Sequence, residues 1–358
     1  MLPRLLSAVF AALLLAACTN IGPQTVPRDR FDYNAAISDS WKEQTLLNIV
    51  KLRYADMPLF VEVASVVSGY TLEGAVNLGA TASSQNAVQG DFLALGGSGK
   101  YTDRPTITYA PITGSQFNQS FMSPIPPGAV LFLMQSGWPV DLIFPLTVDS
   151  INGLRSRSSA GANQRAGDPE FYRVIELLRR FQVAGVSGMR VKKGQDESET
   201  IVLFFHKKNL SPELREAQLE LDRLLGLRTN ADEVTVTYSF LAGSDDELAM
   251  ITRSMLHIMV DLASQIEVPP EDIDEGRTIA ALVPPSEGPM ALSRLIEIRH
   301  GSEPPADAFT AVRYRDLWFW IDDRDFKSKK TFAFLMILFS MTETGGKEGL
   351  PLVTIPAG

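Results

Sequence analysis

The 358-residue chain is long enough for one large domain or two smaller ones, and its 45% hydrophobic and 21% charged residues are those of an average globular protein. Its net charge of −9 makes nucleic-acid binding a poor hypothesis, because such proteins present a basic surface to the phosphate backbone. A single cysteine, Cys18, excludes disulfide frameworks and sites built from several thiolates, such as zinc–cysteine centres.

The first eighteen residues have the features of an export signal. Arg4 provides a positive charge, residues 5–15 form an apolar segment, and Leu15-Ala16-Ala17-Cys18 follows. The apolar segment is shorter than the roughly 20 residues that a membrane-spanning helix needs, so we expect residues 1–17 to be a signal peptide that is removed.

Leu15-Ala16-Ala17-Cys18 resembles the lipobox of bacterial lipoproteins. The resemblance implies cleavage before Cys18, acylation of Cys18 with palmitate-like chains, and firm attachment to a membrane. Because Thr19 rather than aspartate follows Cys18, it also implies a lipoprotein that is forwarded to the outer membrane. We expect the anchored protein to face the periplasm. The resemblance ends there and implies nothing about the fold; the alternative is an ordinary signal peptide with an incidental cysteine.

The next segment, residues 18–30, is predicted to be a tether between lipid and fold, because it has few large apolar residues and contains Gly22, Pro23 and Pro27. A helix is predicted over residues 40–54. Ser40 and Glu43 have the spacing of a capping box there, and apolar residues recur at helical intervals.

Alternating apolar residues predict two strands within residues 60–80 and another over residues 104–112. Between them, residues 79–100 contain five glycines and a run of Ser, Gln and Asn. We interpret this segment as a long loop with a functional role, because long loops without structure of their own are uncommon in compact domains.

A helix is predicted over residues 129–136, and the apolar run at 140–148 is interpreted as a strand. Residues 155–167 are rich in Ser, Arg, Gly and Asn, which is typical of an exposed linker. We therefore place a flexible boundary there, between an N-terminal α+β domain at residues 31–154 and a C-terminal α+β domain at residues 168–358.

Residues 168–241 predict the element order α-β-β-α-β. The elements are a helix at 171–181, strands at 189–193 and 200–207, a helix from Ser211 to Gly226, and a strand at 233–240. The elements predicted after them are a helix at 245–266, a strand at 292–299, a hairpin at 308–322, a helix at 331–341 and an edge strand at 350–355. The chain is thus predicted to be α+β, with mixed or antiparallel sheets, packed helices and two subdomains.

The sequence contains no motif that identifies an enzyme. The histidines, His206, His257 and His300, lack metal-ligand spacing, and the GxSxG and SxxK nucleophile patterns are absent. We therefore expect no metal and no cofactor, and we leave enzymatic activity open. His257 and Asp261 share a face of the predicted helix at 245–266 and are interpreted as a surface pair.

Two groups of residues are candidates for a partner surface. Nine basic residues stand against three acids between residues 155 and 193, and the predicted helix at 171–181 carries three of them: Arg173, Arg179 and Arg180. Trp318 and Trp320 share one face of a predicted strand. They contact a sugar or a partner, or they close the core against the helix at 331–341.

These observations favour a non-enzymatic lipoprotein of the outer membrane. It would be anchored through Cys18 and would act as an assembly, scaffold or accessory component of an envelope complex. The segment at residues 79–100 would offer a strand edge to an envelope protein partner. The alternative is a periplasmic protein that binds or hydrolyses cell-wall glycan, which would require two carboxylates facing each other across a cleft.

Overall fold

The computed structural model describes residues 21–67, 69–81, 92–158, 165–193, 199–206, 210–229, 233–281 and 294–342. The signal, Cys18 and the edge strand predicted at residues 350–355 lie outside these ranges. Helices pack with mixed and antiparallel sheets in the described residues, which confirms the predicted α+β class.

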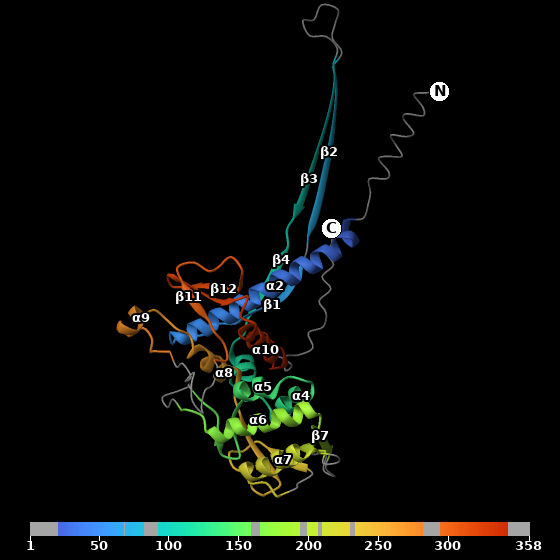
Figure 1. The fold of residues 1–358 in the computed structure, drawn as a ribbon. Helices are drawn as coiled ribbons and strands as arrows, with labels where there is room; N and C mark the ends of the chain where they lie inside the picture. The colour runs from blue at the N-terminus through green and yellow to red at the C-terminus, as the bar shows by residue number, and fades with distance from the viewer. Residues whose placement is uncertain are drawn as a thin grey trace, which may run out of the picture. The chain divides into compact units, whose positions relative to one another are not determined.

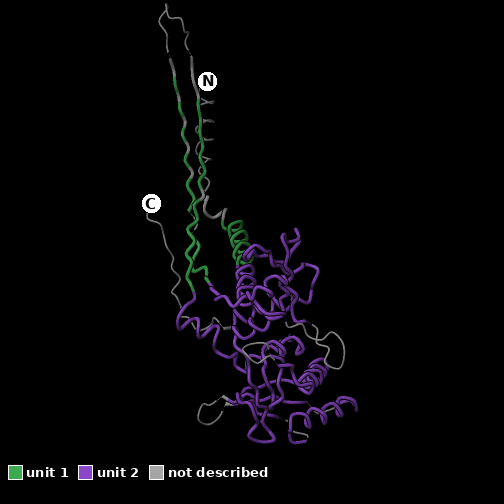
Figure 2. Tube along the Cα trace, turned by 90° about the vertical axis from the view of Figure 1, so that its left-hand side faces the viewer, with its two compact units in different colours: residues 1–40, 61–111, 350–358 green, residues 41–60, 112–349 purple. Residues whose placement is uncertain are grey.

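Contacts within the chain divide it into two compact units (Figure 2). The first consists of residues 1–40, 61–111 and 350–358, and the second of residues 41–60 and 112–349. The boundary predicted at residues 155–167 therefore falls inside the second unit.

Four strands of the first unit form two antiparallel pairs (Figure 1). β1 (Val61–Val67) pairs with β4 (Thr106–Pro111), and the register shifts between Val63 and Ser65. β2 (Tyr70–Thr81) pairs with β3 (Phe92–Asp103) along the whole length of both strands. The strands predicted within residues 60–80 and 104–112 are confirmed.

The loop predicted at residues 79–100 is wrong wherever the structure describes it. Residues 79–81 end β2, and residues 92–100 belong to β3. Glycine and alanine are depleted in strands, which is why this composition indicated a loop. The ladder, however, is made of backbone N–H and C=O groups that small residues also carry, and Gly74 lies directly opposite Gly99.

The helix α2 (Ile21–Arg53) ends as predicted but begins far earlier than residue 40. Residues 21–30, predicted as part of the tether, are helical although Pro27 lies inside the helix. Proline removes one backbone donor and usually breaks a helix. Asp29, two residues later, accepts a hydrogen bond from the Tyr70 hydroxyl of β2, and a tertiary contact of this kind can override a local helix-breaking signal.

The second unit contains a six-stranded mixed sheet in the order β6-β5-β10-β9-β8-β7. β9 and β10 run parallel, and the other neighbours are antiparallel. The strands are β5 (Val148–Ile151), β6 (Leu154–Arg155), β7 (Ser187–Lys193), β8 (Glu199–Phe205), β9 (Glu233–Thr237) and β10 (Glu247–Thr252).

The helices α6 (Pro169–Ala184) and α7 (Pro212–Leu225) complete the element order predicted for residues 168–241, which is confirmed. The Ser211 hydroxyl accepts a hydrogen bond from the Leu214 amide at 3.3 Å, as expected of an N-cap. Gly226 ends α7 at φ 65°, in the left-handed region that glycine adopts most easily.

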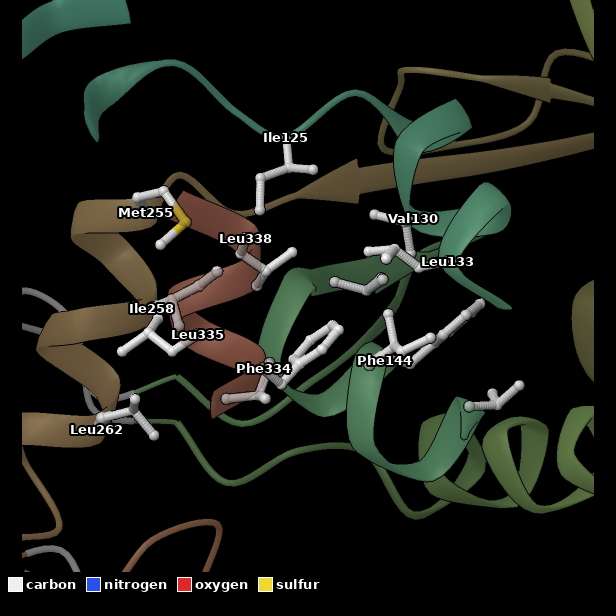
Figure 3. Close-up of a cluster of buried hydrophobic side chains, with 14 of the residues drawn as sticks. Ile125, Val130, Leu133, Phe144, Met255, Ile258, Leu262, Phe334, Leu335 and Leu338 are labelled. Atoms are coloured by element: carbon white, nitrogen blue, oxygen red, sulfur yellow. The ribbon is translucent and has the colours of Figure 1, made fainter. Parts of the chain in front are cut away.

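One apolar core joins the helices of the second unit, and four of them meet in the part of it drawn in Figure 3. They are α4 (Pro127–Gln135), α5 (Val140–Thr147), α8 (Met255–Ala263) and α10 (Phe326–Thr342), and the short α3 (Gly114–Phe117) and π-helical η1 (Asn118–Met122) precede them. Side chains from these helices meet in the close-up, among them Leu133, Phe144, Ile258 and Phe334. The prediction of a helix at 129–136 is confirmed.

Two predicted elements in this unit are wrong. Residues 140–147 form the helix α5 rather than a strand, because a short apolar run fits a buried helix as well as a buried strand. The predicted helix at 245–266 is instead the strand β10 followed by α8. β10 lies between β5 and β9, and these strands supply pairing that no local pattern reveals.

A three-stranded antiparallel sheet in the order β11-β13-β12 completes the second unit. β12 (Ala308–Tyr314) and β13 (Leu317–Asp322) form the predicted hairpin, whose turn places Arg315 at φ 55°. β11 (Arg299–Gly301) begins where the predicted strand at 292–299 was expected to end. The Asp325 carboxylate accepts a hydrogen bond from the Ser328 amide at 3.1 Å, and α10 begins before residue 331.

The end of α2 is joined to residues 266–279, which include the short helix α9 (Pro270–Asp274). The buried Arg53 donates to the Ile266 carbonyl oxygen at 2.9 Å and to the Thr278 hydroxyl at 2.8 Å. The Tyr54 hydroxyl donates to the Asp272 carboxylate at 2.7 Å, and this bond, with that from Arg277, holds the pKa of Asp272 below its ordinary value. These bonds fix the end of α2 within the second unit, to which residues 41–53 belong.

Candidate functional site

The β2–β3 hairpin is the most distinctive surface of the first unit. Each strand has 12 residues, well above the usual length of about 5–6, and the register runs without a bulge from Tyr70 opposite Asp103 to Thr81 opposite Phe92. The two strands form a sheet of their own, so among the described residues neither outer edge has a strand partner. Each outer edge therefore presents backbone donors and acceptors to other chains.

The hairpin lacks the features by which proteins usually protect such edges. Its strands contain no proline and carry only three charged side chains, Glu73, Lys100 and Asp103. By contrast β7, an edge of the six-stranded sheet, carries Arg190, Lys192 and Lys193 within seven residues. Charged side chains, proline and bulges on an edge discourage pairing, and these features are scarce in the described strands of the hairpin.

The base of the hairpin is attached to α2 within the first unit. The Tyr70 hydroxyl donates to Asp29, and the rings of Tyr70 and Tyr101 stack with their centroids 6.1 Å apart. Arg28 forms an ion pair with Asp29 at 2.9 Å. The sequence predicted a strand edge at residues 79–100 but not the residues that attach the hairpin to α2. The contact of Asp29 with Tyr70 joins positions 41 residues apart, so no local pattern reveals it.

The three arginines predicted as a partner surface all lie on α6, but most of their charge is already matched. Arg173 forms two parallel hydrogen bonds to Glu220, at 2.8 and 2.7 Å, and a third to Glu176 at 2.6 Å. Arg180 also contacts Glu176, at 2.6 Å. Arg179 contacts Asp141 at 3.3 Å. Pairing of this kind leaves little free positive charge on this face for an acidic partner.

The tryptophans share one face of β13, as the sequence indicated. Both are half-buried, whereas Phe319 and Ile321 on the opposite face are fully buried. The expectation that the tryptophans close the core is therefore wrong, because Phe319 takes that place. Trp320 instead lies close to Gly301 of β11, where an added Cβ would stand 3.2 Å from its ring.

A buried charge cluster in the second unit was missed from the sequence. Arg253 is 2% exposed and donates to Asp261 at 2.8 Å and to the Pro145 carbonyl at 2.9 Å. His257 Nε2 lies 3.8 Å from Asp261 and 3.3 Å from the Ser158 hydroxyl. The predicted surface pair of His257 and Asp261 is therefore wrong, because Asp261 is buried and its short contact is with Arg253. Ser254, the N-cap of α8, is the local signal that would have placed Arg253 before the helix.

The stability of the fold is expected to fall as the pH drops below about 6.5, in part because of His257. Burial lowers the pKa of His257, and Arg253 and Arg165 act in the same direction, whereas Asp261 and Asp149 oppose them. The unfolded chain therefore takes up this proton at higher pH than the folded chain does. The stability that the neutral His257 contributes is fully present above its pKa in the unfolded chain. It is lost as the pH falls through its lower pKa in the folded chain.

Urea unfolding of the wild type and of His257→Gln at about pH 7.5 and about pH 5.5 measures this effect. The wild type is expected to lose more unfolding free energy between the two conditions than the variant does. His206 and His300 are present in both proteins, so the difference between the two proteins isolates His257. An equal loss in both would contradict the assignment.

The described residues contain no group of three His, Cys, Asp or Glu side chains that could hold a metal ion. Among the described helices, none combines the length and the apolar character needed to cross a membrane. Compared with known proteins, the chain matches no protein-family model, no curated protein and no solved structure.

Proposed function

We propose that this protein is a lipid-anchored component of the bacterial outer membrane, facing the periplasm, that assembles through the edges of its β2–β3 hairpin. One observation carries the proposal: a long, regular hairpin whose outer edges have no strand partner among the described residues. A two-stranded hairpin is marginally stable in water, and edge pairing with further strands would stabilise it.

A second copy of this chain is the partner that fits these edges. β2 and β3 run antiparallel, so the β2 edge of one copy can pair with the β3 edge of the next to continue the same antiparallel sheet. Contacts of this head-to-tail kind repeat from copy to copy. Lipidation at Cys18, predicted from the lipobox, supports the proposal because it would hold the copies in one membrane and raise their effective concentration.

The glycan-hydrolase alternative is less well supported by the pockets of the second unit. Among the residues that the structure describes, one pocket, beside α5 and α6, is lined by a single carboxylate, Asp141, and another, beside α4 and α10, is lined by none. Neither of these pockets provides the pair of carboxylates that glycoside hydrolysis requires.

Shortening the hairpin tests the proposal. Replacing residues 76–97 by an Asn-Gly turn keeps the pairs from Tyr70–Asp103 to Ala75–Ser98 and removes the outer half of both strands. In detergent, the full chain is expected to form a multimer, as measured by light scattering, and the shortened chain a monomer. Tagged wild-type chains should retain co-expressed untagged wild-type chains and release shortened ones.

The apolar core consists of residues of the second unit, so the shortened variant should keep the wild-type urea-unfolding midpoint of that unit. Val191→Lys on the already charged edge strand β7 is a matched control and should leave the mass of the multimer in light scattering unchanged. A monomeric full chain, or equal self-association of the shortened chain, would overturn the proposal. Retention of a different protein without a second copy would overturn the choice of partner.

A further inference from the structure

A pocket of about 380 Å³ in the second unit has a strongly positive lining. It is formed by α5, α6, the first turns of α10 and the segments that follow β6 and β10. Among the described residues of its lining, Asp141 is the only carboxylate, against five cationic side chains: Arg157, Arg179, Arg253, Lys327 and Lys330. Asp141 contacts Arg179, and Arg253 is paired with Asp261, which lies outside the lining.

Arg253 forms a buried and rigid part of this lining. Asp261 and the Pro145 carbonyl hold its Nη1 atom, and the Arg157 carbonyl accepts from Nη2. Its Nε donor is buried and has no hydrogen-bond partner among the described residues. Fixed donors of this kind are pre-organised for an anion, because little side-chain entropy is lost when the anion binds.

Arg157 and Lys330 are the cations that are free to bind. Among the described residues, neither the Arg157 guanidinium nor the Lys330 ammonium has a hydrogen-bonding or ion-pair partner. Burial lowers the pKa of Arg157, and nearby Arg253 adds to this, while Tyr172 and Asp261 oppose it. An arginine stays protonated in proteins even so, and a half-buried unpaired charge beside another cation is unfavourable until an anion binds.

The rest of the lining indicates an organic ligand rather than a bare ion. Leu142, Pro145 and Leu295 provide apolar surface, and the volume falls within the range of about 300–1,000 Å³ that is usual for small-molecule sites. Guanidinium groups match the oxygens of phosphate and carboxylate groups, and several cations around one site favour a doubly charged group.

We propose that this pocket binds a small organic phosphate monoester, with its phosphoryl group held by Arg157 and Lys330 against the fixed Arg253. The site lies in the second unit and does not depend on the hairpin, so its test is independent of the proposed assembly. The phosphoryl group is carried either by a soluble metabolite or by a lipid headgroup, and both present the same dianion.

Isothermal titration calorimetry of the full chain in neutral detergent at low salt tests the proposal, with glycerol 3-phosphate as the probe and glycerol as the neutral control. Saturable binding is expected for glycerol 3-phosphate and not for glycerol. Arg157→Gln should raise the Kd about tenfold or more, because charge-assisted hydrogen bonds are lost. Lys330→Gln should raise it several-fold. Arg173 lies on α6, like Arg179 of the pocket, but it is paired with Glu220 of α7, so Arg173→Gln should leave the Kd unchanged.

A short-chain phosphatidic acid distinguishes the two sources. Binding of glycerol 3-phosphate indicates a soluble ligand, and binding of the phosphatidic acid alone, with the same loss in Arg157→Gln, indicates a lipid headgroup. Thermal unfolding checks that each variant is folded, and Lys330→Gln decides the question if Arg157→Gln is not. Absence of saturable binding by both probes, equal effects of Arg157→Gln and Arg173→Gln, or equally tight binding of the dicarboxylate succinate would overturn the proposal.

Discussion

Asp261→Ala is expected to lower the free energy of unfolding by about 3–5 kcal/mol, because it leaves the Arg253 charge buried without its close carboxylate. Arg253 is 2% exposed and Asp261 is 4% exposed, so water does not replace the lost partner. The next carboxylate, Asp149, lies 3.8 Å from Arg253 and compensates only in part. Urea denaturation followed by circular dichroism measures the change.

A surface ion pair supplies the matched control for this prediction. Glu176 contacts Arg173 and Arg180 at 2.6 Å, but its side chain is 51% exposed. Glu176→Ala is therefore expected to cost less than about 1 kcal/mol despite the two short contacts. The double variant Arg253→Met/Asp261→Leu should lower the free energy of unfolding by less than the sum of the losses for Arg253→Met and Asp261→Leu made singly, because it removes both charges. If Asp261→Ala lowered the free energy of unfolding no more than Glu176→Ala does, the prediction that an unpaired Arg253 charge is costly in the folded protein would be wrong.

Elements that carry their own local signals could be predicted from the sequence. Ser211, Pro212 and Gly226 mark the beginning and end of α7, and the structure uses each of them in that role. The hairpin of β12 and β13 follows from two alternating runs around a short turn. In both cases the determining residues lie within a few positions of the backbone that they shape.

Elements determined by distant residues could not be predicted. The run at 247–252 has the apolar residues of a helix face, yet it is a strand because β5 and β9 pair with it from positions that are remote in the sequence. Residues 92–100 are strand because each lies opposite a residue of β2. Tertiary pairing outweighs local propensity at such positions.

The candidate site divides in the same way. The sequence pointed to residues 79–100 as the edge for a partner, and the structure places the hairpin β2–β3 there, although as paired strands rather than a loop. The cationic pocket was not predicted, although Arg157 and Arg179 belong to the basic stretch between residues 155 and 193. Its members Arg157, Arg253 and Lys330 come from three separate parts of the chain, and a cluster of that kind leaves no spacing pattern in the sequence.

The aromatic run of β13 gives the second large effect, with a ranking opposite to residue size. Phe319 is fully buried and packs edge-on against Tyr54, with their ring centroids 6.3 Å apart. Phe319→Ala is expected to lower the free energy of unfolding by about 3–5 kcal/mol, through lost apolar burial and the cavity left behind. Trp318 is larger but only half-buried, so Trp318→Ala is expected to cost less than about 2 kcal/mol.

Urea unfolding of the two variants in parallel checks this order, and Phe319→Leu is a control that keeps most of the buried volume and should cost less than about 1.5 kcal/mol. The comparison is direct because Phe319 and Trp318 are neighbours on one strand and point to opposite faces of the sheet. A larger loss for Trp318→Ala would mean that the tryptophan face is the buried one, as the sequence suggested. The expected order would instead indicate that the tryptophan side chains are partly accessible to solvent in the folded protein. Such side chains remain available for contact with a partner.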